Sequence, residues 1–188
     1  NRIAEVLSAV HMYENKDMKI GGFSGGMKQR IGIAQTLLNL PRILVVDEPT
    51  AGLDPRERIR FRNLLVELSR NRIVIFSTHI IEDIASSCNQ VGVINKGILK
   101  YNGTPSDMAN IAKDVTWTFE VPVRDFAKLP SDMLIVHHIR QGDIIKVRCL
   151  SEHKPTETAE KILPALEDSY LWLLRSVKIE NKEEIITQ

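Results

Sequence analysis

The sequence decides its fold class at residues 43–55, which read ILVVDEPTAGLDP. Four consecutive apolar residues, most of them β-branched, are typical of a strand buried on both faces of a parallel sheet. Asp47 and Glu48 come directly after this strand. We therefore expect both carboxylates at the carboxyl-terminal edge of the sheet, where α/β proteins bind their ligands.

A complete set of start signals predicts a helix directly after this stretch. Asp54 can cap the helix, Pro55 suits its first position, and Glu57 can reach back to the cap. We expect the helix to run to about Arg70 and to bury four apolar side chains. These are Phe61, Leu64, Leu65 and Leu68. Such a helix returns the chain to the start of the sheet, as a parallel connection requires.

The alternation of strand and helix then continues. Ile73–Phe76 is a second apolar run and predicts another buried strand, followed by a helix from about Ile80 to Ser87. Val91–Ile94 and Ile98–Tyr101 flank Asn95-Lys96-Gly97, which predicts a hairpin with glycine at a left-handed position. This order of elements predicts an α/β fold with a largely parallel core sheet.

Two helices are expected before the first strand. Apolar residues at helical spacing over residues 2–13 predict one of them. The other runs from about Met27 to Asn39, and Pro41 ends it because proline disfavours helix at the preceding residue. Ser24-Gly25-Gly26 leads into this second helix. There the glycines let backbone N–H groups approach an anion, and the helix dipole adds partial positive charge.

The pattern changes near residue 113. Apolar and polar residues alternate over 115–121 and again over 145–149, as in strands with one buried face. A further strand is expected over Leu134–Ile139. These are signs of a sheet with one face toward a core, unlike the wholly apolar strands before it.

Two helices complete this second region, a short one after Pro155 and another after Pro164. Strands followed by helices predict a small α+β domain. We therefore expect the chain to divide into residues 1–112 and an appended α+β domain over residues 113–188.

Length and composition exclude several classes of protein. The 188 residues, 43% of them hydrophobic, suffice for one medium domain or two small ones. The net charge of +1 argues against bulk electrostatic binding to nucleic acid. Cys88 and Cys149 form no C-x-x-C pair, so neither a disulfide framework nor a zinc site is expected. Apolar runs are far shorter than the roughly 20 residues that span a bilayer, so a membrane role requires a partner.

The carboxylate pair after the first strand suits phosphoryl transfer. One acid at such a place holds magnesium, and a second residue orients or deprotonates the attacking water. His79 follows the second strand and can donate a hydrogen bond to a phosphate oxygen at the same edge. Each motif alone has a plainer reading, since Asp47-Glu48 can simply end a strand and Thr78 can cap a helix that begins at His79.

In order and spacing, the motifs resemble the ATP-binding cassette (ABC) ATPase family, the motor subunits of transporters. The resemblance rests on residues 23–30 (FSGGMKQR), residues 43–55 and Ser77-Thr78-His79, and it covers residues 1 to about 112. It implies that Asp47 is the acid of a Mg²⁺ site and Glu48 the catalytic base. It makes His79 the switch histidine, which contacts the γ-phosphate of ATP.

Two further motifs imply a composite site between two subunits. Ser24, Gly25, Gly26 and Met27 match the signature motif, which contacts the ATP held by the opposite subunit. Phe23 and Met27 depart from the commonest form of this motif, which has Leu and Gln there. Asp54 belongs to a loop that meets the partner subunit in this family, and its role as a helix cap is compatible with that contact.

The phosphate loop G-x-x-x-x-G-K-[ST], which grips the nucleotide, does not occur in the 188 residues. The chain therefore resembles the C-terminal part of an ABC ATPase, truncated before that loop. We expect this piece alone neither to bind ATP tightly nor to hydrolyse it.

The resemblance is strongest to bacterial exporters of the drug and antibiotic type, in which the ATPase and the membrane subunit are separate polypeptides. Residues 166–171 (LEDSYL) resemble a C-terminal element of the same branch. The implied partners are a second ATPase subunit and an integral membrane permease, with no nucleic acid. The implied location is the cytoplasmic face of the cell membrane.

Two other classes of function stay open. One is a cytosolic ABC ATPase that acts on nucleic acid or ribosomes, although the chain shows no basic stripe and no heptad insertion. The other is a non-catalytic regulatory subunit that lacks a phosphate loop, although Asp47, Glu48 and His79 are all present. The sequence upstream of Asn1 would distinguish these readings.

Overall fold

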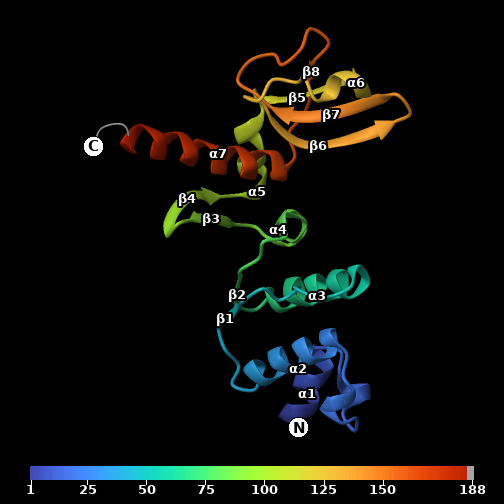
Figure 1. Ribbon diagram of the computed structural model, residues 1–188. Coiled ribbons are helices and arrows are strands. Elements are labelled where there is room, and N and C mark those ends of the chain that lie inside the picture. The colour runs from blue at the N-terminus through green and yellow to red at the C-terminus, as the bar shows by residue number, and fades with distance from the viewer. Residues whose placement is uncertain (186–188) are drawn as a thin grey trace. The chain divides into compact units, whose positions relative to one another are not determined.

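The computed structural model describes the backbone of residues 1–185 and the side chains of residues 1–175 (Figure 1). The chain forms two compact units, Asn1–Ser87 and Cys88–Gln188. This division falls earlier than the border expected between residues 112 and 113. The expected border remains a prediction about domain organisation. Both units mix helices with sheets, in agreement with the expected fold class.

The first unit alternates helices with two short strands. Its first helix, expected to reach residue 13, ends at Ala9, and His11 then takes a left-handed backbone with φ of 56°. The helix expected from Met27 begins two residues earlier, because Ser24 caps it. The elements are α1 (Arg2–Ala9), η1 (Tyr13–Asn15), η2 (Ile20–Gly22), α2 (Gly25–Leu37), β1 (Ile43–Val46), α3 (Pro55–Leu68), β2 (Ile73–Phe76) and α4 (Ile81–Ser87).

Strands β1 and β2 pair in parallel, with Ile43 opposite Ile73 and Val46 opposite Phe76. Leu44 of β1 belongs to a core that α1, α2 and α3 also line. The four side chains expected to be buried on α3 are all buried there, and Phe61 is 1% exposed. The parallel pairing and the helix between the strands confirm the α/β prediction for this unit.

One expectation about these strands was wrong. Both were expected to be buried on both faces, but alternate residues face solvent in the described structure. The exposed fractions are 55% for Ile43, 71% for Val45, 59% for Ile73 and 53% for Ile75. A wholly apolar run fits a strand with two buried faces. The run does not indicate which segment of the protein packs against the second face of the sheet. Within residues 1–175, the helices of the first unit pack against only one face of this sheet.

The second unit contains a hairpin and a four-stranded antiparallel sheet in the order β6-β7-β5-β8. In the hairpin Gly97 has φ of 78°, as expected, and Lys96 is also left-handed. The elements are β3 (Val91–Asn95), β4 (Ile98–Gly103), α5 (Pro105–Ala109), η3 (Asn110–Ala112), β5 (Thr116–Pro122), α6 (Val123–Phe126), β6 (Leu134–Gln141), β7 (Ile144–Leu150), β8 (Glu160–Lys161) and α7 (Leu166–Ile185).

The expected helix after Pro155 does not form. That segment makes turns and then the short strand β8, which pairs with β5 at Trp117 and Thr118. The helix α5 was not expected, although its signals are present in the sequence. Thr104 caps it by accepting a hydrogen bond from the Asp107 N–H at 3.1 Å, and Pro105 occupies its first turn.

Two buried polar residues in LEDSYL tie α7 to the rest of the second unit. Asp168 accepts hydrogen bonds from Arg148 on β7 and from the Ala165 N–H. The Ser169 hydroxyl donates to the Ala109 carbonyl at 2.7 Å and accepts from the Ala112 N–H at 3.1 Å. Hydrogen bonding to Asp168 raises the pKa of the Arg148 guanidinium, which keeps that group charged. The motif thus fixes the start of α7 against the sheet.

Cys149 is expected to resist alkylation in the folded protein. Burial in the core of the second unit raises the pKa of its thiol to about 11. At pH 8 its reactive thiolate is therefore scarce, and it becomes abundant only as the pH rises toward that value. Iodoacetamide at pH 8, followed by mass spectrometry of the peptides, should modify Cys149 in urea and leave it unmodified in buffer. Equal modification in both conditions would contradict its burial.

Candidate functional site at the end of the parallel strands

The carboxyl ends of β1 and β2 are joined by Ser77. Its hydroxyl donates a hydrogen bond to the Asp47 carboxylate and accepts one from the Glu48 N–H at 3.0 Å. Ser77 also donates its own backbone N–H to the Val46 carbonyl at 3.0 Å. These contacts place Asp47 and Glu48 at one edge of the sheet, the position expected for them.

Glu48 and His79 form a direct pair at this edge. The distance between His79 Nδ1 and Glu48 Oε2 is 2.6 Å, and the two side chains are 69% and 41% exposed. Glu48 has a left-handed backbone with φ of 45°, a conformation that is uncommon for a residue with a long side chain. The structure thus brings together the two residues to which the resemblance gives catalytic roles. The roles themselves stay predictions.

The plainer reading of this region is confirmed only in part, because Thr78 shapes the turn but α4 begins at Ile81 rather than at His79. The Thr78 hydroxyl accepts a hydrogen bond from the Ile80 N–H at 3.0 Å, and α4 begins at the next residue. Thr78 therefore shapes the turn that carries His79. Because this turn follows β2 directly, it fixes His79 next to the end of β1.

The signature-like segment forms the exposed N-terminus of α2. The Ser24 hydroxyl accepts a hydrogen bond from the Met27 N–H at 3.2 Å, so Ser24 is the cap of the helix. Gly25 is exposed, whereas Gly26 lies against α3, where a Cβ atom would come within 3.0 Å of a Glu57 oxygen. Met27 packs against the core. An exposed helix N-terminus with glycines offers backbone N–H groups to an anion.

Ser24 and Asp54 do not join the Glu48–His79 pair. Among residues 1–175, no hydrogen bond or ion pair connects either of them to Asp47, Glu48 or His79. Asp54 instead caps α3 by accepting from the Glu57 N–H at 2.9 Å, as expected.

Two residues of α2 that were not singled out in the sequence link that helix to the loop after β1 and to α3. Gln29 donates from Nε2 to the Ala51 carbonyl at 3.3 Å, and Arg30 lies 3.0 Å from the Glu57 carboxylate. The Gln29 Oε1 atom is buried and has no hydrogen-bond partner in the described structure. The sequence signal that could have identified Gln29 and Arg30 is their place in F-S-G-G-M-K-Q-R, on the helix turn after the glycines.

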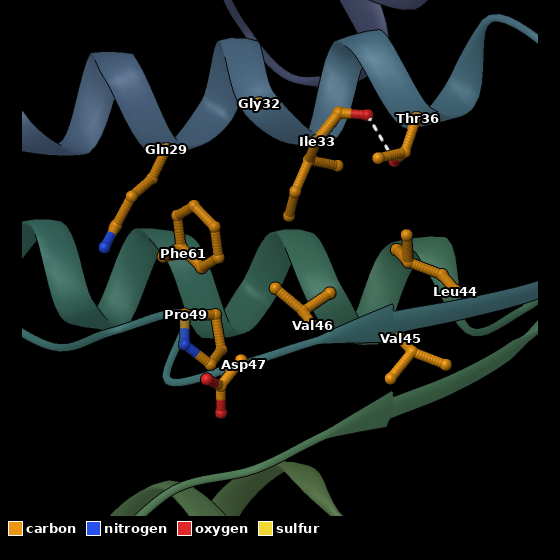
Figure 2. Close-up of a pocket in the computed structure, with 10 residues that line it drawn as sticks. All are labelled: Gln29, Gly32, Ile33, Thr36, Leu44, Val45, Val46, Asp47, Pro49 and Phe61. Atoms are coloured by element: carbon orange, nitrogen blue, oxygen red, sulfur yellow. Dashed lines mark hydrogen bonds between the residues drawn. The ribbon is translucent and has the colours of Figure 1, made fainter.

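A pocket of about 170 Å³ lies beside Gln29, between α2 and β1 (Figure 2). Asp47 and Pro49 line it at the end of β1, and Phe61 of α3 lines it from below α2. Apart from Gln29, Thr36 and Asp47, its lining is apolar. The pocket therefore lacks the cationic groups that a phosphate needs, and the candidate chemistry stays at the Glu48–His79 pair.

No helix within residues 1–185 has both the length and the apolar character to cross a bilayer.

Comparison with known proteins points to one family. A family model described as ABC transporter matches residues 1–51. The uncharacterized ABC transporter ATP-binding protein YxlF of Bacillus subtilis is 37% identical over 120 residues, which are 64% of this chain and 41% of YxlF. The bacitracin transport ATP-binding protein BcrA of Bacillus licheniformis is 45% identical over 101 residues, which are 53% of this chain and 33% of BcrA. The chain therefore spans less than half the length of these relatives.

Solved structures agree with the sequence matches. The cbiO1 protein of Clostridium perfringens, part of the ABC transporter complex cbiONQ, superposes with a TM-score of 0.54 at 33% identity. The match covers 56% of this chain and 43% of cbiO1. The strand that ends in Asp47-Glu48, the signature-like helix start and the His79 turn all lie within the first unit. Together with these matches, they make the chain similar to ATP-binding proteins of the ABC transporter family.

Proposed function

We propose that this chain supplies the hydrolytic side of an ATP site in the motor subunit of a transporter. The observation that carries the proposal is the Glu48–His79 pair, 2.6 Å apart, beside Asp47 at the carboxyl end of two parallel strands. Ligands of α/β proteins bind at this edge. The relatives supply the substrate class, because they are named as ATP-binding proteins of transporters.

Glu48 is the base in this proposal. Its carboxylate accepts a proton from a water molecule as the water oxygen bonds to the γ-phosphorus and the bond to the bridging oxygen of ADP breaks. His79 holds Glu48 through Nδ1, which leaves Nε2 to donate to a γ-phosphate oxygen when the ring carries both protons. Partial exposure of both side chains leaves them open to a nucleotide from the solvent side.

The Asp47 carboxylate and the Ser77 hydroxyl fit a magnesium site. Mg²⁺ prefers oxygen ligands and usually takes one or two carboxylates from the protein beside phosphates and water. When bound, the ion would neutralise charge on the phosphates. Asp47 would hold it, while Ser77 orients Asp47.

The exposed N-terminus of α2 supports a composite arrangement. Ser24 and Gly25 face solvent, and neither is hydrogen-bonded to Glu48 in the described structure, so we propose that they meet the ATP of a second ATPase subunit. Closure of two such subunits would drive an integral membrane permease. The similarity to a bacitracin transport protein supports a role in transport. Export as the direction rests on the resemblance of residues 23–30 and 43–55 to bacterial exporters. Accumulation of a labelled substrate inside inverted vesicles would support export, and its loss from them would contradict it.

The test of this proposal compares the 188-residue chain with a longer form that includes a phosphate loop. We expect the 188-residue chain to show no ATP hydrolysis above background. The reason is that the G-x-x-x-x-G-K-[ST] loop, which cradles the phosphates, does not occur in it. The longer form should hydrolyse ATP with Mg²⁺ and stop with excess EDTA. Turnover by the 188-residue chain that Glu48→Ala abolishes would contradict the inactivity of this piece. A longer form without turnover would contradict the ATPase proposal.

A further inference from the structure

The Glu48–His79 pair cannot set its own geometry. Both side chains are in contact with water, where a salt bridge is screened and contributes little. Glu48 and His79 lie in two different loops, Glu48 after β1 and His79 after β2. Ser77 and the pairing of β1 with β2 fix the starts of these loops, and a buried contact farther along them would keep Glu48 and His79 at a constant separation.

A buried polar cluster includes one residue from each of these two chain segments. Thr50 is 2% exposed and Asp83 is fully buried, and the Thr50 hydroxyl donates to Asp83 Oδ2 at 2.5 Å. The other carboxylate oxygen, Oδ1, accepts from Arg62 Nη1 at 3.2 Å and lies 3.6 Å from Arg58 Nε. We call these four residues, Thr50, Arg58, Arg62 and Asp83, the Asp83 cluster.

The Asp83 cluster connects the backbone segments that carry the pair. Thr50 is two residues after Glu48, in the loop that leads from β1 to α3. Asp83 is four residues after His79, in the first turn of α4. Arg58 and Arg62 lie one turn apart on α3, whose buried face is part of the core. One carboxylate thus joins the Glu48 loop and the His79 helix to a rigid third element.

We propose that Asp83 and Thr50 are positioning residues, which hold Glu48 and His79 at the separation that hydrolysis needs. This inference rests on the proposed ATPase function. Asp83 acts by its two oxygens: one holds the Glu48 loop through Thr50, and the other anchors α4 to the arginines of α3. A buried carboxylate with both oxygens paired is costly to disturb, so the arrangement is stiff.

The Thr50→Val substitution isolates the positioning effect. Valine has nearly the shape of threonine but lacks the hydroxyl, so it releases the Glu48 loop from Asp83 and leaves the Asp83–arginine contacts in place. Thr50→Ser restores the hydroxyl and serves as the rescue. Thr118→Val is the matched control, because the Thr118 hydroxyl also donates a partly buried hydrogen bond, to the Val147 carbonyl in the second unit.

The first readout is amide hydrogen exchange in the 188-residue chain, which requires no ATP. In Thr50→Val we expect exchange to rise about tenfold over both residues 49–54 and α4, since a shared buried contact couples their local opening. Exchange in α2 should not change, and Thr50→Ser and Thr118→Val should resemble the wild type. Faster exchange in only one of the two segments, or equal acceleration in α2, would overturn the proposal.

The second readout is ATP hydrolysis by the longer form with its phosphate loop. We expect Thr50→Val to lower kcat about tenfold while KM stays within about twofold, because misplaced catalytic groups affect the chemical step more than binding. Thr50→Ser should recover most of the rate. A proportional fall in kcat and thermal stability without rescue would assign the cluster a structural role only. If the wild type does not hydrolyse ATP, the proposed function fails while the exchange result still tests the coupling.

Discussion

Replacement of Glu48 by Gln in the form that includes a phosphate loop should lower ATP hydrolysis by about 10²–10⁴ and leave ATP binding intact. That range is the usual contribution of a general base. Glutamine has the shape of glutamate and can still accept a hydrogen bond from His79 Nδ1, but its amide cannot take a proton from water at neutral pH. The variant should therefore remain in an ATP-bound dimer.

The chain offers a close control for this variant. Glu67 on α3 also faces a histidine, with 3.8 Å between its Oε2 and His11 Nε2, and both of those side chains are exposed. Glu67→Gln changes the same functional group at a surface pair far along the helix from Asp54. Its hydrolysis rate should equal that of the wild type. Binding is measured with a fluorescent ATP analogue and hydrolysis by phosphate release under single-turnover conditions. A wild-type rate in Glu48→Gln would show that Glu48 is not the base.

Replacement of Asp168 by Asn should destabilise the second unit by about 3 kcal/mol, the lower end of the range for removal of one partner from a buried ion pair. Asp168 is fully buried and accepts from Arg148 and from the Ala165 N–H. An asparagine directs two N–H donors toward groups that are themselves donors. Arg148 would then keep a partly buried charge without its carboxylate.

Urea unfolding followed by the fluorescence of the two tryptophans, Trp117 and Trp172, which both belong to the second unit, measures this effect. Asp125→Asn is the control, because Asp125 pairs with Lys128 on the surface of the same unit. We expect its midpoint to match that of the wild type. An equal midpoint for Asp168→Asn would mean that the Arg148–Asp168 pair contributes nothing to the attachment of α7.

Local sequence signals predicted much of this structure. The strand Ile43–Val46 lies where its apolar run places it, and Asp54 and Pro55 start α3 as their capping chemistry requires. Alternation predicted β5 and β7, which pair in a register that puts Phe119 opposite Val147 in the core. In each case the information lies within a few residues of the element.

The remaining features depend on residues far apart in the chain. Thr50 and Asp83 are separated by 33 positions, and no local pattern marks a threonine that will donate to a buried carboxylate. The segment after Pro155 forms a strand rather than a helix because β5 offers it an edge, which is a tertiary effect that overrides local preference. The bare face of β1 and β2 likewise depends on which segments cover the sheet.

The most direct test of the central claim is a double-mutant cycle of Glu48→Gln and His79→Ala, measured as single-turnover ATP hydrolysis by the form with a phosphate loop. If the two residues act as one unit on the same ATP, the double variant should be no slower than Glu48→Gln alone. If the two losses multiply, the residues act independently. The contact between His79 and Glu48 would then have no part in the hydrolytic step.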